Sequence, residues 1–201
     1  MIIALVGSSL DGSAYTDVVN LAGRSPSWLD TAVSAWSTYG LALFPVLMAI
    51  GWWRARRVGA AASVTALAVP FVVVVAFGVD TALKALVRED RPCHGLRVST
   101  LEACPAPGDW SFPSNHAAIA AAAAVALLFV RRRLGAVAVV AACAMAASRV
   151  WIGVHYPHDV VAGVLVGSLV ALLARSVLRR VSQPFALRVM ATRLRPLVVA
   201  S

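Results

Sequence analysis

Charged residues are scarce in this sequence, at 13% of its 201 residues, and only nine of them are acidic. Hydrophobic residues make up 60%, and the mean hydropathy is +0.81. This composition excludes an ordinary soluble domain and indicates a membrane protein. Internal repeats, linkers and a second compositional region are also absent. We therefore expect residues 1–201 to form a single membrane-embedded domain with its core at residues 58–178.

A basic start is missing from the apolar segment Met1 to Leu10, which is too short to span a bilayer and does not read as a signal peptide. The segment from Asp17 to Leu21, together with Trp28 and Leu29, predicts an interfacial helix. Residues 1–33 would then lead into the first span. A sixth, broken span in this region is the alternative.

Five apolar runs are long enough, or nearly long enough, to cross a membrane as helices. They are Ser34–Trp53, Val58–Leu83, His116–Val130, Leu134–Val150 and Val160–Leu178. The third and fourth have about 15 to 17 residues, so at a rise of about 1.5 Å per residue they must cross nearly upright or through a thinned bilayer. The sequence thus predicts an all-α fold, a polytopic membrane helix bundle with five spans, or six in the alternative.

Arginine is concentrated at alternate ends of these spans. The residues are Arg54, Arg56, Arg57, Arg131, Arg132, Arg133, Arg175, Arg179, Arg180, Arg188, Arg193 and Arg195. By the positive-inside rule these ends face the cytoplasm, which makes residues 179–201 a cytoplasmic basic tail. All nine acidic residues fall at the opposite ends. The net charge of +9 therefore follows from topology, so the expected partner is anionic membrane lipid and not nucleic acid.

Three polar clusters interrupt the apolar sequence, and the predicted topology places all of them on the extracytoplasmic side. In the first cluster, Lys84 lies about two helical turns before Arg91. Pro92 ends any helix there and lets the Arg91 guanidinium present its donor fork to phosphate oxygens. Lys84 is the only lysine in the chain. The alternative is that Lys84 is an interfacial lysine paired with Asp80, one turn earlier.

The second cluster, Pro113 to His116, immediately precedes an alanine-rich span. Ser114 is a natural N-cap, and the free backbone N–H groups of such a helix end attract anions. Asn115 adds a hydrogen-bonding side chain, and His116 would stand beside a phosphate as proton donor to the departing oxygen. The alternative for Ser114 is that it only caps the helix.

The third cluster combines Arg149 at the end of a span with His155 in a turn and Asp159 at the start of the next span. Pro157 can occupy the first helical position, which lets the Asp159 carboxylate hold one imidazole nitrogen of His155 and leave the other free as a nucleophile. The alternative for Asp159 is an acid that the helix dipole favours. His158 is interpreted as structural.

The spacings Lys84-x6-Arg91-Pro92, Pro113-Ser114-x-His116 and Ser148-Arg149-x5-His155-x3-Asp159 resemble the three-part signature of the type 2 phosphatidic acid phosphatase superfamily. One departure is Asn115, where many members carry glycine. The resemblance implies that His155 attacks phosphorus, that His116 protonates the leaving group, and that the resulting phosphohistidine is hydrolysed with His116 as base. Asp159 would orient His155. The residues that would bind the phosphate are Lys84, Arg91, Ser114, Asn115 and Arg149.

No metal or other cofactor is expected, because Glu89, Asp90, Glu102 and Asp109 form no spaced ligand set with histidines. A multi-pass chain of this kind would act on a lipid phosphate or diphosphate in the cell membrane. Within the family it is most similar to bacterial undecaprenyl-diphosphate phosphatases, and phosphatidic acid or phosphatidylglycerol phosphate is the alternative substrate. A lipid transporter or scaffold is the non-enzymatic alternative.

Two of the three cysteines, Cys93 and Cys104, lie in the predicted extracytoplasmic loop, where oxidation can join them in a disulfide. Two unpaired thiols are the alternative. The third, Cys143, is expected to be buried within a span.

Overall fold

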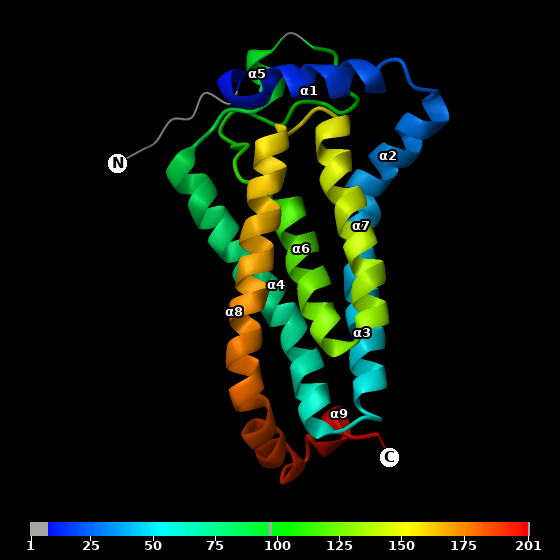
Figure 1. Cartoon of the computed structure of the whole chain (residues 1–201), viewed down its shortest axis with the longest axis vertical. Helices are drawn as coiled ribbons and strands as arrows, with labels where there is room; N and C mark the ends of the chain where they lie inside the picture. The colour runs from blue at the N-terminus through cyan, green and yellow to red at the C-terminus, as the bar shows by residue number, and fades with distance from the viewer. Residues whose placement is uncertain (1–7, 97, 201) are drawn as a thin grey trace.

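The structure, a computed structural model, describes residues 8–96 and 98–200, and within them all regular secondary structure is helical. The helices are α1 (Ser8–Ala22), α2 (Ser27–Tyr39), the 3-10 helix η1 (Gly40–Ala42), α3 (Leu43–Ala55), α4 (Ala60–Val87), α5 (Pro92–Gly95), α6 (Asn115–Val130), α7 (Arg132–Trp151), α8 (Pro157–Met190) and α9 (Arg195–Val198). The predicted all-α bundle is therefore confirmed (Figure 1).

Four helical segments of the described chain are long and apolar enough to cross a membrane. They are Ser27–Ala55, Ala60–Gly95, Arg132–Trp151 and Pro157–Met190. The shorter α6, with 16 residues, stands between α4, α7 and α8 and contacts all three (Figure 1). It corresponds to the third predicted span, and its length agrees with the short apolar run in the sequence. We call the two ends of the bundle the α1 end and the arginine-rich end.

Small residues let the central helix pack closely against its neighbours. Eight of the nine buried residues of α6 are alanine, and α8 presents Gly163 and Gly167 to them. A Cβ atom at Gly163 would lie 2.5 Å from the backbone oxygen of Ser114, and one at Gly167 would collide with the backbone of Ala118. Close backbone approach through small residues is a general means of packing helices in membranes, where burial of apolar side chains gives little driving force. This packing fixes the position of the α6 N-terminus along the axis of α8.

Helix α1 lies across one end of the bundle and does not run along it (Figure 1). The Tyr15 hydroxyl is buried and donates a hydrogen bond to the Gly153 carbonyl at 2.8 Å. Tyr15 also packs with Val150, Tyr156 and Val160. An interfacial α1 agrees with the sequence prediction, and the described residues contain no sixth span.

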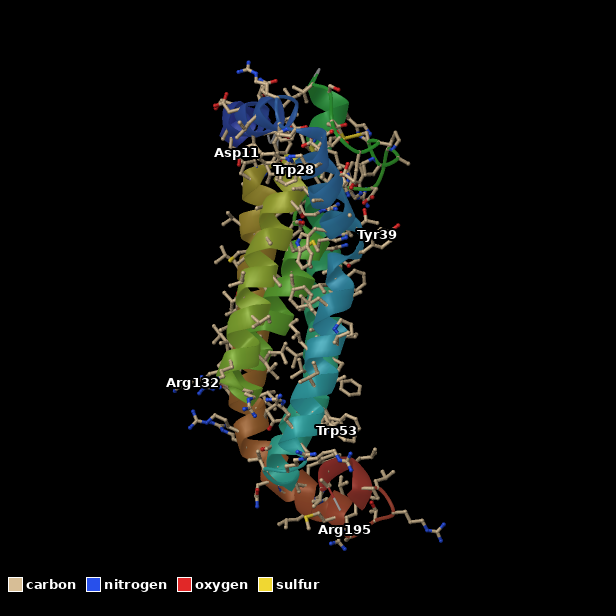
Figure 2. All side chains as sticks on the ribbon, turned by 90° about the vertical axis from the view of Figure 1, so that its right-hand side faces the viewer. Asp11, Trp28, Tyr39, Trp53, Arg132 and Arg195 are labelled. Carbon is tan, nitrogen blue, oxygen red and sulfur yellow. A yellow bond between two sulfur atoms is a disulfide. The ribbon has the colours of Figure 1, made fainter. Side chains whose placement is uncertain are left out.

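The first spanning segment begins earlier than predicted. Trp28 and Leu29 belong to α2 and not to the interfacial helix, because the chain turns at residues 23–26 and α2 begins at Ser27. Figure 2 shows Trp28 and Trp53 near opposite ends of the run from α2 to α3. Trp28 marks the beginning of the segment, which the apolar run Ser34–Trp53 missed, whereas the end of that run at Trp53 lies close to the observed end at Ala55.

The last spanning helix ends later than predicted, since α8 continues from Leu178 through Pro184 to Met190. Arginine favours helix, so the basic residues after Leu178 end the apolar run without ending the helix. Beyond α8 the chain folds back, and Val198 of α9 packs with Val64 and Ala186. Residues 191–200 thus close the arginine-rich end (Figure 2).

The cysteines occupy two environments. Cys93 and Cys104 form a disulfide across the segment between α4 and α6. Cys143 lies in α7 but is exposed at the surface of the bundle, so the prediction that it is buried is wrong. The buried residues of α7 include Ala138, Ala141, Ala142 and Met145, and position 143 falls on the opposite face of the helix.

Substituting Gly167 by alanine tests the close contact between α6 and α8. The added methyl group would collide with the Ala118 backbone, and overpacking of this kind costs about 1–3 kcal/mol. We expect the Gly167→Ala protein to unfold at a lower temperature than the wild type in the same detergent. The matched control is Gly78→Ala in α4, where the new methyl group meets open space. Equal melting temperatures for the two variants would contradict the close contact.

Candidate active site

The three polar clusters of the sequence meet at the α1 end. The first cluster consists of Lys84 near the end of α4 and Arg91 in the segment that follows, and the α6 N-terminus carries the second. The third runs from Arg149 at the end of α7 through His155 in the next turn to Asp159 at the start of α8. All three lie beneath α1 and α5 (Figure 1). Six of the eight residues proposed from the sequence are buried at this end, namely Lys84, Arg91, Ser114, Arg149, His155 and Asp159. Asn115 and His116 are half-buried beside them.

His155 and Asp159 form the centre of this group. The Nδ1 atom of His155 lies 3.3 Å from Asp159 Oδ2, and this oxygen also accepts hydrogen bonds from the Tyr156 backbone N–H at 2.8 Å and from the Ser111 hydroxyl. The other imidazole nitrogen, Nε2, lies 3.3 Å from Arg91. The carboxylate therefore favours the tautomer with the proton on Nδ1, in which the Nε2 lone pair faces the Arg91 guanidinium.

Burial sets the protonation state of His155, whose side chain is 2% exposed. Desolvation lowers the pKa of His155 to about 3, although the hydrogen bond with Asp159 acts in the opposite direction. Arg91 and Arg149 lower the pKa further through charge repulsion. His155 is consequently a neutral imidazole at physiological pH, which is the form in which it can act as a nucleophile.

Arg91 connects the α4–α6 segment to the turn that carries His155. Its Nε donates to the Asp109 carbonyl at 2.8 Å, and its guanidinium also forms an ion pair of 3.1 Å with the Asp109 carboxylate. One terminal nitrogen donates to the Val154 carbonyl at 2.9 Å and faces His155. The sequence predicted a guanidinium aimed at phosphate oxygens. The structure adds that this group also holds the surrounding backbone in place.

Lys84 points into the same segment. Its ammonium group donates to the Trp110 carbonyl at 2.7 Å and to the Ser111 carbonyl at 3.4 Å. No ion pair with Asp80 occurs in the part of the chain that the structure describes, and both carboxylate oxygens of Asp80 are buried without a hydrogen-bond partner there. The alternative of a Lys84–Asp80 pair is thus not seen.

The N-terminus of α6 has unused hydrogen-bonding groups. Ser114 occupies the N-cap position, but its side chain makes no capping hydrogen bond, and its backbone N–H donates to the Asp159 carbonyl at 3.0 Å. The Ser114 hydroxyl and the side-chain oxygen of Asn115 are buried without a hydrogen-bond partner among the described residues. Buried polar groups are nearly always hydrogen-bonded, so the Ser114 hydroxyl and the free N–H groups of the first turn of α6 are suited to bind an anion. His116 lies in this turn.

Arg149 approaches the site from the end of α7. One terminal nitrogen donates to the Ser37 hydroxyl of α2 at 2.6 Å, and Nε is buried without a partner in the described chain. The first spanning segment thereby positions an arginine of the site, a role that no motif in the sequence indicated. The Nε–H group of Arg149 is therefore available to donate a hydrogen bond to a ligand.

A second network surrounds His158 and was not predicted from the sequence beyond a structural role for this residue. The His158 ring lies 2.8 Å from Asp11 through Nδ1 and 3.0 Å from Glu89 through Nε2. Its backbone N–H also donates to Asp11 at 2.7 Å. A histidine between two carboxylates is placed as a double donor, so it ties α1 and the segment after α4 to the start of α8.

The acidic part of this network bears on metal binding. Glu89, His158 and Asp159 each offer one ligand atom within 4.8 Å of the others. The two His158 nitrogens face carboxylates, and Asp159 Oδ2 accepts three hydrogen bonds or close contacts from its neighbours. Both ring nitrogens of His158 and Asp159 Oδ2 are therefore engaged in a hydrogen-bond network, whereas Asp159 Oδ1 is buried without a hydrogen-bond partner in the described chain.

Sequence reasoning missed four residues of the site region: Asp11, Ser37, Glu89 and Ser111. Ser111 lies three residues before Ser114, and Glu89 lies two residues before Arg91, so their position next to a motif was a usable signal. Asp11 and Ser37 are far from every motif in the sequence. Only the folded chain brings them to the α1 end.

Comparison with known proteins finds curated relatives of moderate identity. The chain is 33% identical over 122 residues to an undecaprenyl-diphosphatase of Sulfolobus acidocaldarius, a match that covers 60% of this chain and 55% of the relative. It is 40% identical over 103 residues to a decaprenylphosphoryl-5-phosphoribose phosphatase of Mycobacterium tuberculosis, covering 51% of this chain and 55% of the relative. The chain thus spans about half the length of the curated relatives it matches.

A solved structure shows the same fold. The crystal structure of LpxE from Aquifex aeolicus superposes with a TM-score of 0.68 at 22% identity, covering 88% of this chain and 99% of the other. The family model of the PAP2 superfamily matches residues 65–182. This range is more than half of the chain and includes all three polar clusters. The protein therefore belongs to the PAP2 superfamily.

Proposed function

We propose that this protein is a membrane lipid phosphatase that converts a polyprenyl diphosphate, undecaprenyl diphosphate in the first instance, to its monophosphate. The observation that carries the proposal is the neutral His155 held by Asp159 through Nδ1, with Nε2 facing the positive charge of Arg91. Metal-independent phosphoryl transfer needs such a nucleophile beside fixed positive charge.

In the first step the Nε2 lone pair of His155 attacks the terminal phosphorus, and the bond from phosphorus to the bridging oxygen breaks. His116 gives a proton to that oxygen, and the lipid monophosphate leaves. Asp159 stabilises the positive charge that develops on the imidazole. Lys84, Arg91, Arg149 and Ser114 hold the phosphoryl oxygens during the transfer, together with the N-terminus of α6.

In the second step water attacks the phosphohistidine. His116, which lost its proton in the first step, accepts a proton from this water, and the bond from phosphorus to nitrogen breaks. Inorganic phosphate leaves, His155 is again neutral, and the protons balance over the cycle. Asn115 occupies the position at which a small residue would leave more room, and its side chain would lie beside the phosphate held at the α6 N-terminus.

Two observations support a polyprenyl substrate and an extracytoplasmic site. Both curated relatives described above carry polyprenyl lipids in their names. The twelve arginines noted in the sequence lie away from the α1 end, so the positive-inside rule assigns the α1 end to the extracytoplasmic side. The lipid phosphate would reach the site from the surrounding membrane.

Phosphate release by the purified protein in detergent, with excess chelator present, tests this function. We expect release from undecaprenyl diphosphate that resists the chelator and exceeds release from phosphatidic acid and phosphatidylglycerol phosphate. A preference for either phospholipid would overturn the polyprenyl assignment. Failure of a folded protein to act on any of the three would favour a transporter or scaffold.

Matched variants test the assigned roles in the same assay. We expect His155→Ala to lose activity by more than about a thousandfold, and Asp159→Asn by about a hundred- to ten-thousandfold, because an amide no longer favours the reactive tautomer. The control is Asp90→Asn, which changes an exposed carboxylate in the same segment and should retain activity. Equal activity in Asp90→Asn and Asp159→Asn would exclude the proposed role of Asp159.

Acid sensitivity tests the neutral state of His155. Its pKa is lowered from 6.5 to about 3 in the folded protein, so the unfolded chain binds an additional proton between these pH values. Stability should therefore fall as the pH is lowered below about 6.5. We expect the melting temperature of the wild type to drop more between pH 7 and pH 5 than that of His155→Asn. The control His94→Asn removes an exposed histidine and should behave like the wild type.

A further inference from the structure

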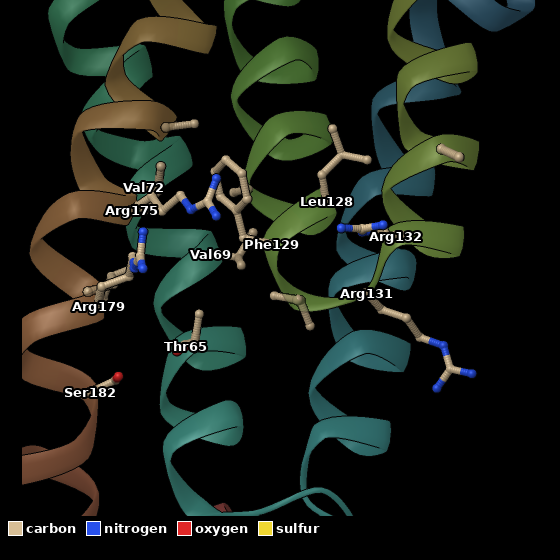
Figure 3. Close-up of a pocket in the computed structure, with 15 residues that line it drawn as sticks. Thr65, Val69, Val72, Leu128, Phe129, Arg131, Arg132, Arg175, Arg179 and Ser182 are labelled. Atoms are coloured by element: carbon tan, nitrogen blue, oxygen red, sulfur yellow. The ribbon is translucent and has the colours of Figure 1, made fainter.

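A cavity of about 980 Å³ lies at the arginine-rich end, on the far side of the bundle from His155. It is open to the surroundings and lined by residues of α4, α6, α7 and α8, which Figure 3 shows. Its polar lining consists of four arginines, Arg131, Arg132, Arg175 and Arg179, with Thr65 and Ser182. The lining contains no histidine, cysteine or carboxylate, so its chemistry is that of a binding site and not of a second catalytic site.

The short central helix explains why this space exists. Helix α6 ends at Val130, where Arg131 adopts an extended conformation and α7 begins in the opposite direction. Gly135 permits a tight return, because a Cβ atom there would collide with the backbone of Leu128. Helices α4 and α8 continue beyond this point, so no central helix fills the gap between them (Figure 1).

The arginines of the cavity lack acidic partners. None of the ion pairs in the described part of the chain includes Arg131, Arg132, Arg175 or Arg179. The guanidinium of Arg175 lies 4.1 Å from the centre of the Phe129 ring, and such a contact fixes its position. Figure 3 shows Arg175 extending from α8 toward Phe129 and Arg179 on the same helix nearby, whereas Arg131 points away from both. Arg175 and Arg179 thus place positive charge together that an anion would neutralise.

The depth of these arginines matches the level of lipid headgroups. Arg175 lies 18 residues along α8 from Pro157, which corresponds to about 27 Å, and Arg179 lies at about 33 Å. The hydrocarbon core of a bilayer is about 30 Å thick. With the start of α8 at one membrane surface, both guanidinium groups therefore reach the phosphate level of the opposite leaflet. The apolar residues Val69, Val72 and Ala171 line the part of the cavity suited to an acyl chain.

We propose that this cavity binds an anionic phospholipid from the leaflet at the arginine-rich end, with Arg175 and Arg179 as the main contacts to its phosphate. Unpaired cations at the edge of the hydrocarbon are costly, and an anionic headgroup offsets that cost by pairing with them. Basic pockets between spanning helices are suited to such headgroups. The bound lipid takes the place of the missing lower turns of α6 and stabilises α4 against α8.

Binding of phosphatidylglycerol to the delipidated full-length protein tests this site, measured as lipid retained in native mass spectrometry and as a rise in melting temperature. The cavity variant is Arg175→Gln with Arg179→Gln. The matched control is Arg180→Gln with Arg188→Gln, which removes the same charge from exposed positions of α8 that do not line the cavity. We expect the wild type and the control to bind equally and the cavity variant to bind at least about tenfold more weakly, a loss of about 1.4 kcal/mol.

Further arms of the experiment identify the ligand. Phosphatidylcholine and inorganic phosphate should each give no comparable rise in melting temperature. An equal rise in melting temperature with inorganic phosphate would overturn the lipid assignment. An equal loss of phosphatidylglycerol binding in the cavity and control variants would mean that only overall charge matters, and it would overturn the proposed site. Unchanged binding in the cavity variant would also overturn it. If the double variant does not fold, the single variant Arg179→Gln is compared with Arg180→Gln in the same binding measurement, and the same outcomes apply.

Discussion

Asp159 is the residue through which the parts of the candidate active site are joined. One carboxylate oxygen contacts His155, the Ser111 hydroxyl and the Tyr156 backbone, and the Asp159 carbonyl accepts a hydrogen bond from the N-cap of α6. The α4–α6 segment, the α7–α8 turn and the start of α6 are thereby fixed relative to one another. The protonation state of His155 depends on the same enclosure, since the burial that lowers its pKa comes from these segments.

The central alanine-rich helix links this site to the opposite end of the bundle. At its N-terminus, α6 supplies free N–H groups beside His155, and glycines of α8 let it approach closely enough to do so. At its C-terminus, the same helix stops short of its neighbours and leaves the cavity lined by arginines. A short, closely packed helix thus produces a polar site at one end and a basic cavity at the other. Between them lies a closely packed apolar cluster that includes many of the α6 alanines.

Much of this architecture could be predicted from the sequence, because membranes restrict the choice of fold and because phosphate chemistry needs particular residues. Apolar runs indicated the helices, and the spacing from Lys84 to Arg91 and from His155 to Asp159 indicated one site. Contacts over long sequence separations could not be predicted, such as those of Asp11 with His158 and Ser37 with Arg149. Helix ends were misplaced where charge ended an apolar run but not the helix, as after Leu178.

The most direct test of the proposed phosphohistidine mechanism is to look for phosphate bound covalently to His155. The protein would be mixed with radiolabelled lipid diphosphate, quenched in alkali within the first turnover and analysed by mass spectrometry of its peptides. We expect a phosphate that is stable in alkali and labile in acid, located on His155 and absent from His155→Ala. Label on another residue, or phosphate release at the normal rate in His155→Ala, would contradict it.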